Sequence, residues 1–386
     1  LLPRIIPASA HPLRVYAFLE IGIAVFGVLL LFLMPLVGRV YLAWGGYGLT
    51  GFLLRGVVAA VCLLPPTLAM GATLPAVARW VKTTPEGISW LGFFYAGNIA
   101  GAVFGSLLAG FYLLRVFDMA TATYVAVNAM VAAAALTLAS ATDAEVDRVV
   151  REVRLRADPT YAETTKAGAG GAVVVYVAIA LSGFCALAGE VIWTRLLGLL
   201  FGATVYTFSI ILAVFLIGLG IGSSVGSMLS RSLARPRLVL GWCQLLVVAA
   251  IAWTARTLTE SLPYWPVSPT LSPDIWLSFE FDFVRTLWAI LPPAVLWGAS
   301  FPLALASVTS EGQDPGRLVG RMYAANTIGA VVGSLAASLL LVAWIGSQRA
   351  QQAMMALSAL AGLMLLVTAT PYRLVGVIAA VVLMGP

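Results

Sequence analysis

The 386 residues are 61% hydrophobic and only 10% charged, whereas a soluble domain carries about 25% charged residues. A chain this apolar cannot cover its own surface in water, so we expect it in a bilayer, and its apolar runs of about 18 residues or more exclude the alternating strands of a membrane barrel. The net charge of +6 does not indicate nucleic-acid binding, because the basic residues stand at the ends of the apolar runs.

The apolar runs predict an all-α, polytopic transmembrane bundle, because each crossing needs about 20 residues. Most lysines and arginines stand at one set of helix ends, and the positive-inside rule makes that side cytoplasmic. The predicted helices occupy 12–37, 51–79, 89–114, 118–140, 172–192, 198–229, 236–256, 283–308, 318–344 and 348–369, and a further truncated helix begins within 373–386.

Two segments between these helices differ in composition. Residues 141–171 are charged and end in Gly-Ala-Gly-Gly, which is typical of a linker, and they lie on the cytoplasmic side. Residues 257–282 are rich in proline, tryptophan and acidic residues, and they are expected to form a loop on the opposite side. Glycines spread through 218–226 are expected to bring helix 198–229 close to a neighbour.

The three cysteines, Cys62, Cys185 and Cys243, lie inside apolar runs. We expect them to be buried, reduced and inert. Their spacing matches neither a metal site nor a disulfide framework, so we predict no metal ligand and no cofactor.

The chain repeats two motifs at a large, nearly constant offset. Residues 63–75 read LLPPTLAMGATLP and residues 290–302 read ILPPAVLWGASFP, while 95–106 read YAGNIAGAVFGS and 323–334 read YAANTIGAVVGS. A spacing this long indicates duplication of half a protein.

The repeat also predicts a topology. Pro12 matches Pro236, and the six predicted helices between them are an even number, so the two copies should be parallel repeats related by an axis along the membrane normal. The second copy, 172–369, begins with two helices that have no counterpart before Pro12. We therefore expect the first copy, 1–140, to lack its first two helices, about sixty residues long, and 370–386 to be the start of another helix.

The repeated proline pairs mark the strongest candidate site. Proline removes a backbone donor, and the freed carbonyls need partners from neighbouring helices, water or a ligand. Matching breaks in two halves of a membrane protein point to a central site, although kinks that only let the halves pack would give the same pattern. The candidate substrate-binding residues of the two breaks are Pro65, Pro66, Gly71, Pro292, Pro293 and Gly298.

Two asparagines accompany the second motif. Asn98 and Asn326 each stand three residues before a glycine pair spaced as GxxxG. Such pairs bring helices together, and the amides then hydrogen-bond across the interface. The asparagines are therefore predicted either to join helices or to bind substrate.

Glu20 and Glu190 are carboxylates inside apolar runs, and an ionisable residue at this depth is a functional candidate. Glu190 has Arg195 within reach, so it is read either as half of an ion pair or as a cation ligand. Glu20 matches the neutral Gln244 of the second copy, and it is a candidate for a cation site or a proton relay.

Several motifs resemble those of one family. Residues 182–197 read SGFCALAGEVIWTRLL, residues 202–209 read GATVYTFS, and 218–223 read GLGIGS. Together with the repeated motifs, they resemble the membrane part of bacterial fused major-facilitator/spermidine-synthase proteins. This chain has Gly189 where that family has an aromatic residue before the glutamate.

The resemblance implies a major-facilitator-like helical domain in the bacterial inner membrane, followed in the family by a soluble aminopropyltransferase-like domain. No glycine-rich turn between a strand and a soluble helix occurs in these residues, so we assign no catalytic residue and leave enzyme activity open. The implied function is to anchor, and to supply with polyamine, an enzyme domain outside this chain.

Two other functions fit the same sequence. One is a transporter that moves a small cation or polyamine by alternating access about the paired breaks. The other is a structural subunit of a larger membrane complex, with other membrane subunits as partners. A cavity that reaches the prolines and Glu20 would favour transport, and a core filled by side chains would favour the structural role.

Overall fold

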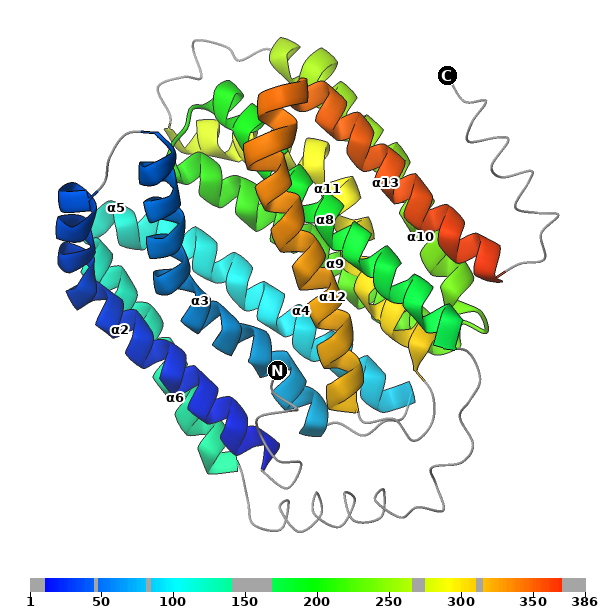
Figure 1. Cartoon of the computed structure of the whole chain (residues 1–386), viewed down its shortest axis with the longest axis horizontal. Helices are drawn as coiled ribbons and strands as arrows, with labels where there is room; N and C mark the ends of the chain where they lie inside the picture. Colours follow the sequence, from blue (N-terminus) through cyan, green and yellow to red (C-terminus); the bar gives the residue numbers. More distant parts are fainter. Residues whose placement is uncertain are drawn as a thin grey trace. The chain divides into compact units, whose positions relative to one another are not determined.

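A computed structural model describes residues 11–44, 48–80, 85–140, 169–265, 275–309 and 315–369. All described elements are helices (Figure 1). They are α2 (Pro12–Trp44), α3 (Leu49–Trp80), α4 (Pro85–Leu108), η1 (Ala109–Leu113), α5 (Leu114–Val116), α6 (Met119–Ser140), α8 (Ala169–Phe201), α9 (Val205–Ser232), α10 (Pro236–Arg256), η3 (Thr257–Ser261), η4 (Leu262–Tyr264), α11 (Ile275–Val308), α12 (Pro315–Ala336), η5 (Ala337–Ile345) and α13 (Gly346–Ala369).

These helices are long and apolar enough to cross a bilayer. Within the described ranges, 9 stretches meet this condition, and the last, Leu318–Ala369, contains both α12 and α13. Between them lies η5, which meets α13 at Gly346, whose φ of 79° favours glycine. The prediction of an all-helical, multi-pass membrane protein is confirmed, whereas the symmetry axis between two copies stays a prediction.

Two predicted boundaries were wrong. Residues 198–201 end α8 instead of beginning the next helix, because Gly202 adopts a φ of 91° and Thr204 then caps α9 by accepting from the Thr207 N–H. Residues 275–282 begin α11 instead of belonging to a loop. Phe279 explains this difference, since its ring packs against those of Phe111 and Tyr206. The distances between ring centroids are 5.1 and 5.0 Å, respectively.

Parts of other predictions lie outside the described residues. These are most of the linker 141–171, whose last three residues belong to α8, and the C-terminal segment 370–386. The middle of the predicted loop 257–282 lies outside them as well, while its first residues continue α10 as η3 and η4.

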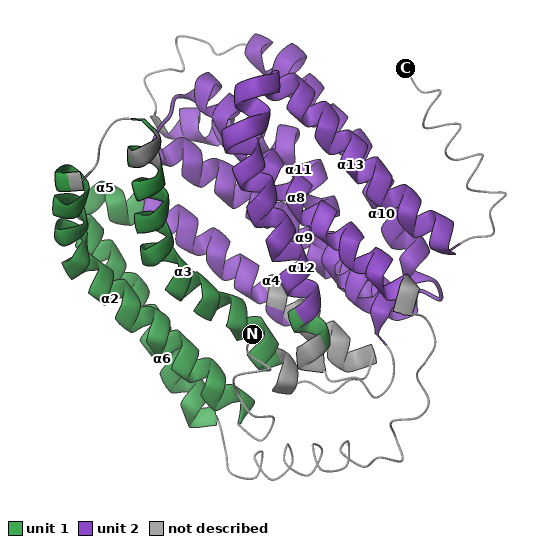
Figure 2. Cartoon of the chain, in the orientation of Figure 1, with its two compact units in different colours: residues 1–82, 112–164, 314–320 green, residues 83–111, 165–313, 321–386 purple. Residues whose placement is uncertain are grey.

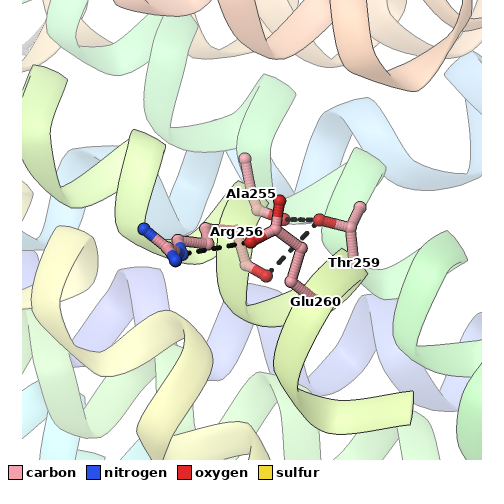
Figure 3. A network of polar contacts seen from close by, with 4 residues as sticks. All are labelled: Ala255, Arg256, Thr259 and Glu260. Carbon is pink, nitrogen blue, oxygen red and sulfur yellow. Dashed lines mark hydrogen bonds and ion pairs between the residues drawn. The ribbon is translucent and has the colours of Figure 1, made fainter. Parts of the chain in front are cut away.

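The π turn η3 carries an exposed polar network (Figure 3). Arg256 and Glu260 form an ion pair at 3.1 Å, and the Thr259 hydroxyl donates to the Ala255 carbonyl at 2.9 Å. Both charged side chains are largely exposed, so water screens the pair and it adds little stability.

The described helices form two compact units (Figure 2). Unit 1 takes its residues from 1–82, 112–164 and 314–320, and unit 2 takes the remainder. In unit 1, α2 packs against both α3 and α6. Helix α4 precedes α6 in sequence but belongs to unit 2, because it packs against α9.

Unit 2 contains the larger core. Helix α10 packs against α11 and α13, and α9 packs against α11. This pattern matches the pattern around α2 in unit 1, since α3 and α6 precede α11 and α13 by about one repeat. The fully buried side chains of this core include Trp193, Ile192, Leu197, Ile290, Met322 and Met354.

In unit 1, Asp118 caps the first turn of α6. Its Oδ1 accepts from the Thr121 backbone N–H at 2.8 Å, as expected of an aspartate at an N-cap. Hydrogen bonds from the Thr121 side chain and backbone hold the pKa of Asp118 below its ordinary value of 3.8. Because the folded pKa is depressed, this cap stabilises the protein above that value and is lost as the pH falls through the folded pKa.

We therefore expect Asp118→Ala to lower the Tm at neutral pH, because the Thr121 N–H loses its acceptor. Asp118→Asn keeps a carbonyl acceptor but does not titrate, so it should retain the cap and lose the acid dependence that this residue contributes. Thermal unfolding of the detergent-solubilised protein between about pH 7 and pH 3 measures both effects. A Tm of Asp118→Ala equal to the wild type at neutral pH would contradict this role.

Candidate functional site

The proline pair of α11 does not interrupt the helix, which continues from Ile275 to Val308. In a helix, the carbonyls of Trp288 and Ala289 would accept from the backbone N–H groups of residues 292 and 293, four positions later. Both of these residues are prolines, which have no N–H to donate. We call this segment the α11 break. It leaves two carbonyl oxygens that need other donors in a bilayer.

Two consecutive side chains of α10 supply these donors. The Trp253 Nε1–H donates to the Trp288 carbonyl at 3.0 Å, and the Thr254 hydroxyl donates to the Ala289 carbonyl at 2.7 Å. Thr254 is fully buried. The α11 break is therefore satisfied by a neighbouring helix and requires no ligand.

Glycines next to the break bring α11 against α9. An added Cβ on Gly298 would collide with the Leu219 carbonyl oxygen, so only glycine permits this approach. On α9, an added Cβ on Gly218 would collide with Ala294 of α11, and one on Gly222 would collide with the Val295 carbonyl oxygen. The prediction that the glycines of 218–226 pack closely is confirmed for this face.

An aromatic stack lies beside the break. Trp297 stacks on Trp193 of α8 with ring centroids 5.5 Å apart and planes at 28°, and both side chains are buried. The Trp193 Nε1–H donates to Gln351 Oε1 of α13 at 3.0 Å. Three helices thus meet at one tryptophan. Sequence reasoning missed Gln351, because its partner lies far away in the chain.

The position of the Trp297 ring also explains why residue 189 is a glycine. A Cβ on Gly189 would lie 3.0 Å from Trp297 and 3.0 Å from Met354. No space remains there for the aromatic side chain of the family pattern.

A polar cluster lies in the core of unit 2. The Gln244 side chain is 1% exposed and donates through Nε2 to Ser300 Oγ at 2.8 Å and to Ser182 Oγ at 3.4 Å. The Cys243 thiol donates to the Leu296 carbonyl at 3.3 Å. Ser300 was missed although it occupies the place of Thr73 in the repeated motif, a signal that could have identified it.

Glu190 is half-buried on α8, and Arg195 is exposed. The ion pair expected between them is absent from those that the described residues form. Within the same unit, Arg285 does have a carboxylate partner, since it lies 3.6 Å from Asp282 and donates to the Trp265 carbonyl at 3.2 Å.

The break of α3, in unit 1, differs from the α11 break. Pro65 is exposed, and Pro66 and Gly71 are partly buried, in a helix that again continues through the prolines. These prolines free the carbonyls of Val61 and Cys62. The residues of α2 that match Trp253 and Thr254 are Leu29 and Leu30, whose side chains have no hydrogen to donate.

Glu20 is half-buried on α2, where the Tyr16 hydroxyl forms a hydrogen bond with it. Tyr16 lies four residues earlier, on the same face of the helix. The sequence interpretation overlooked this neighbour.

The two asparagines have different surroundings. Asn326 of α12 is half-buried, and its carbonyl oxygen lies so close to Gly183 of α8 that no Cβ would fit there. Asn98 of α4 is exposed within unit 2.

The candidate residues belong to two compact units. Glu20, Pro65, Pro66 and Gly71 belong to unit 1, whereas Asn98, Glu190, Pro292, Pro293, Gly298 and Asn326 belong to unit 2. In the part of the chain that the structure describes, no group of three His, Cys, Asp or Glu side chains could hold a metal ion.

Comparison with known proteins adds no assignment. No protein-family model matches the chain, and no curated protein matches it.

Proposed function

We propose that this chain is the membrane domain of a spermidine-synthase-like protein of the bacterial inner membrane, and that it holds an aminopropyltransferase-like domain at the cytoplasmic face. The sequence resemblance around Glu190 and Trp193 supports the family. The packing of unit 2 supports a holding function, because Pro293, Ala289 and Thr254 of the α11 break are buried against α10, while Pro292 is exposed.

The two hydrogen bonds from α10 to the α11 break carry this proposal. A hinge at Pro292 and Pro293 would have to break the bonds from Trp253 and Thr254 and expose two carbonyls to lipid. The glycine contacts between α9 and α11 place backbone against backbone, so these helices cannot slide without separating. Both features favour a rigid scaffold over alternating access about α11.

A specific observation favours a second candidate, which is a carrier of a small cation or polyamine. In unit 1, the α3 break has no donor at the matching positions of α2, and the Glu20 carboxylate stands on that helix. Carbonyl oxygens and a carboxylate are suitable ligands for an ammonium group. Transport would then depend on unit 1.

Flux across a bilayer separates the two functions. We expect sealed liposomes that contain the chain to take up no more labelled spermidine than protein-free liposomes do. This should hold with and without a pH gradient or a membrane potential. Saturable uptake by the wild type that is lost in Glu20→Gln would contradict the scaffold and establish the carrier. A Glu260→Gln variant is the matched control, since Glu260 is exposed and paired with Arg256.

A further inference from the structure

The repeated motif Asn-x-x-Gly-x-x-x-Gly occurs on α4 and on α12, but only one copy is covered by a helix. In α12, Gly329 and Gly333 are buried, and a Cβ on them would collide with the carbonyl oxygens of Ala180 and Phe184 of α8. The second copy therefore forms a close helix–helix interface.

In α4, the matching glycines are bare within unit 2. Gly101 and Gly105 are exposed, and an added Cβ on either would meet no heavy atom within 4 Å. Asn98 is exposed on the same motif. Helix α4 packs on α9 through a different side, because its buried residue Ile99 contacts Gly220.

Such a face is unsuited to lipid. An asparagine amide exposed to hydrocarbon leaves its donors and acceptor unsatisfied. Paired glycines expose backbone and lose the packing that a neighbouring helix would supply, and small residues at this spacing are typical of helix interfaces in membranes.

The second copy indicates the chemistry of the missing neighbour. The helix that covers Asn326, Gly329 and Gly333 presents Ala180 and Gly183, so two backbones can approach closely. We propose that Asn98, Gly101 and Gly105 form a docking surface for a transmembrane helix with the small-residue pattern of α8. This α4 surface is distinct from the two proline breaks and independent of whether the chain transports a cation.

A peptide with the sequence of residues 169–201 is the probe for this surface. The peptide carries an N-terminal dansyl group and Trp193→Phe, so that only the 11 tryptophans of the intact chain act as energy donors. In lipid vesicles, we expect energy transfer to saturate near one peptide per chain. The double variant Gly101→Leu/Gly105→Leu should abolish the saturable transfer, and so should Gly183→Leu in the peptide.

The matched control is Ala100→Leu. Ala100 is exposed on α4, and its counterpart Ile328 stays 64% exposed when α12 is covered by α8. This variant should bind the peptide as the wild type does. Thermal unfolding should show no loss of stability in Gly101→Leu/Gly105→Leu, since both glycines are exposed and an added Cβ on either meets no heavy atom within 4 Å.

Three results would overturn the proposal. Transfer that rises linearly with peptide, in the wild type and the double variant alike, would mean that the surface faces lipid. Wild-type dimers that the double variant abolishes, without peptide binding, would mean that a second copy occupies it. A large loss of stability in the double variant would mean that the chain already covers the surface with its own helices.

Discussion

Gly222→Leu is expected to prevent the chain from keeping its native fold. An added Cβ at this position would collide with the Val295 carbonyl oxygen and lie 2.9 Å from the Ala299 nitrogen. Both are backbone atoms, so α9 and α11 would have to separate. Overpacking of a core costs about 1–3 kcal/mol and occasionally more, and we expect about 3 kcal/mol or more here because no side chain can move aside.

The fraction of monodisperse protein that remains after heating in detergent measures this loss. Gly198→Leu is the control, because Gly198 lies on α8 and an added Cβ there would meet no atom within 4 Å. It should retain wild-type stability. Equal behaviour of the two variants would show that α9 and α11 do not approach as closely as the structure has them.

The second large effect is expected from Thr254→Val. This substitution keeps the shape of the side chain but leaves the Ala289 carbonyl without its donor in the core. A buried polar group that loses its partner costs about 1–3 kcal/mol. We therefore expect a clear fall in unfolding free energy, measured by denaturant titration in mixed micelles.

A double-mutant cycle tests the cause. Pro293→Ala restores an N–H that can donate to Ala289 along the helix, so Thr254→Val should cost much less in that background. Thr259→Val serves as the control, because the Thr259 hydroxyl is exposed and its bond to the Ala255 carbonyl lies outside the core, so its loss should change little. Equal costs of Thr254→Val with and without Pro293 would contradict the explanation.

Much of this architecture could be predicted from the sequence because it depends on local chemistry. Continuous apolar runs need a bilayer and must be helical there, and the structure confirms long apolar helices. The glycines near Gly222 were expected to pack closely, since small residues are enriched where membrane helices pack against each other. The carbonyls freed by the proline pairs could also be predicted, because proline lacks a backbone N–H wherever it stands in a helix.

The partners of those groups could not be predicted from local chemistry. Trp253 and Thr254 lie 35 residues from the carbonyls they satisfy, and Gln351 lies 158 residues from Trp193. Only the packing of one helix against another brings such groups together. Phe279 shows the same effect on secondary structure, because contacts with Phe111 and Tyr206 favour a helix where composition predicted a loop.

The sequence by itself determined that this is a multi-pass helical membrane chain with two matching breaks and two matching glycine motifs. The tertiary structure decided that the copies are used differently. One break receives donors from its neighbour, whereas leucines stand at the positions of α2 that match those donors. One glycine motif is buried, and the other is exposed within unit 2. The physical reason is that a motif fixes what a helix surface can bind, whereas only the neighbouring helices determine what it does bind.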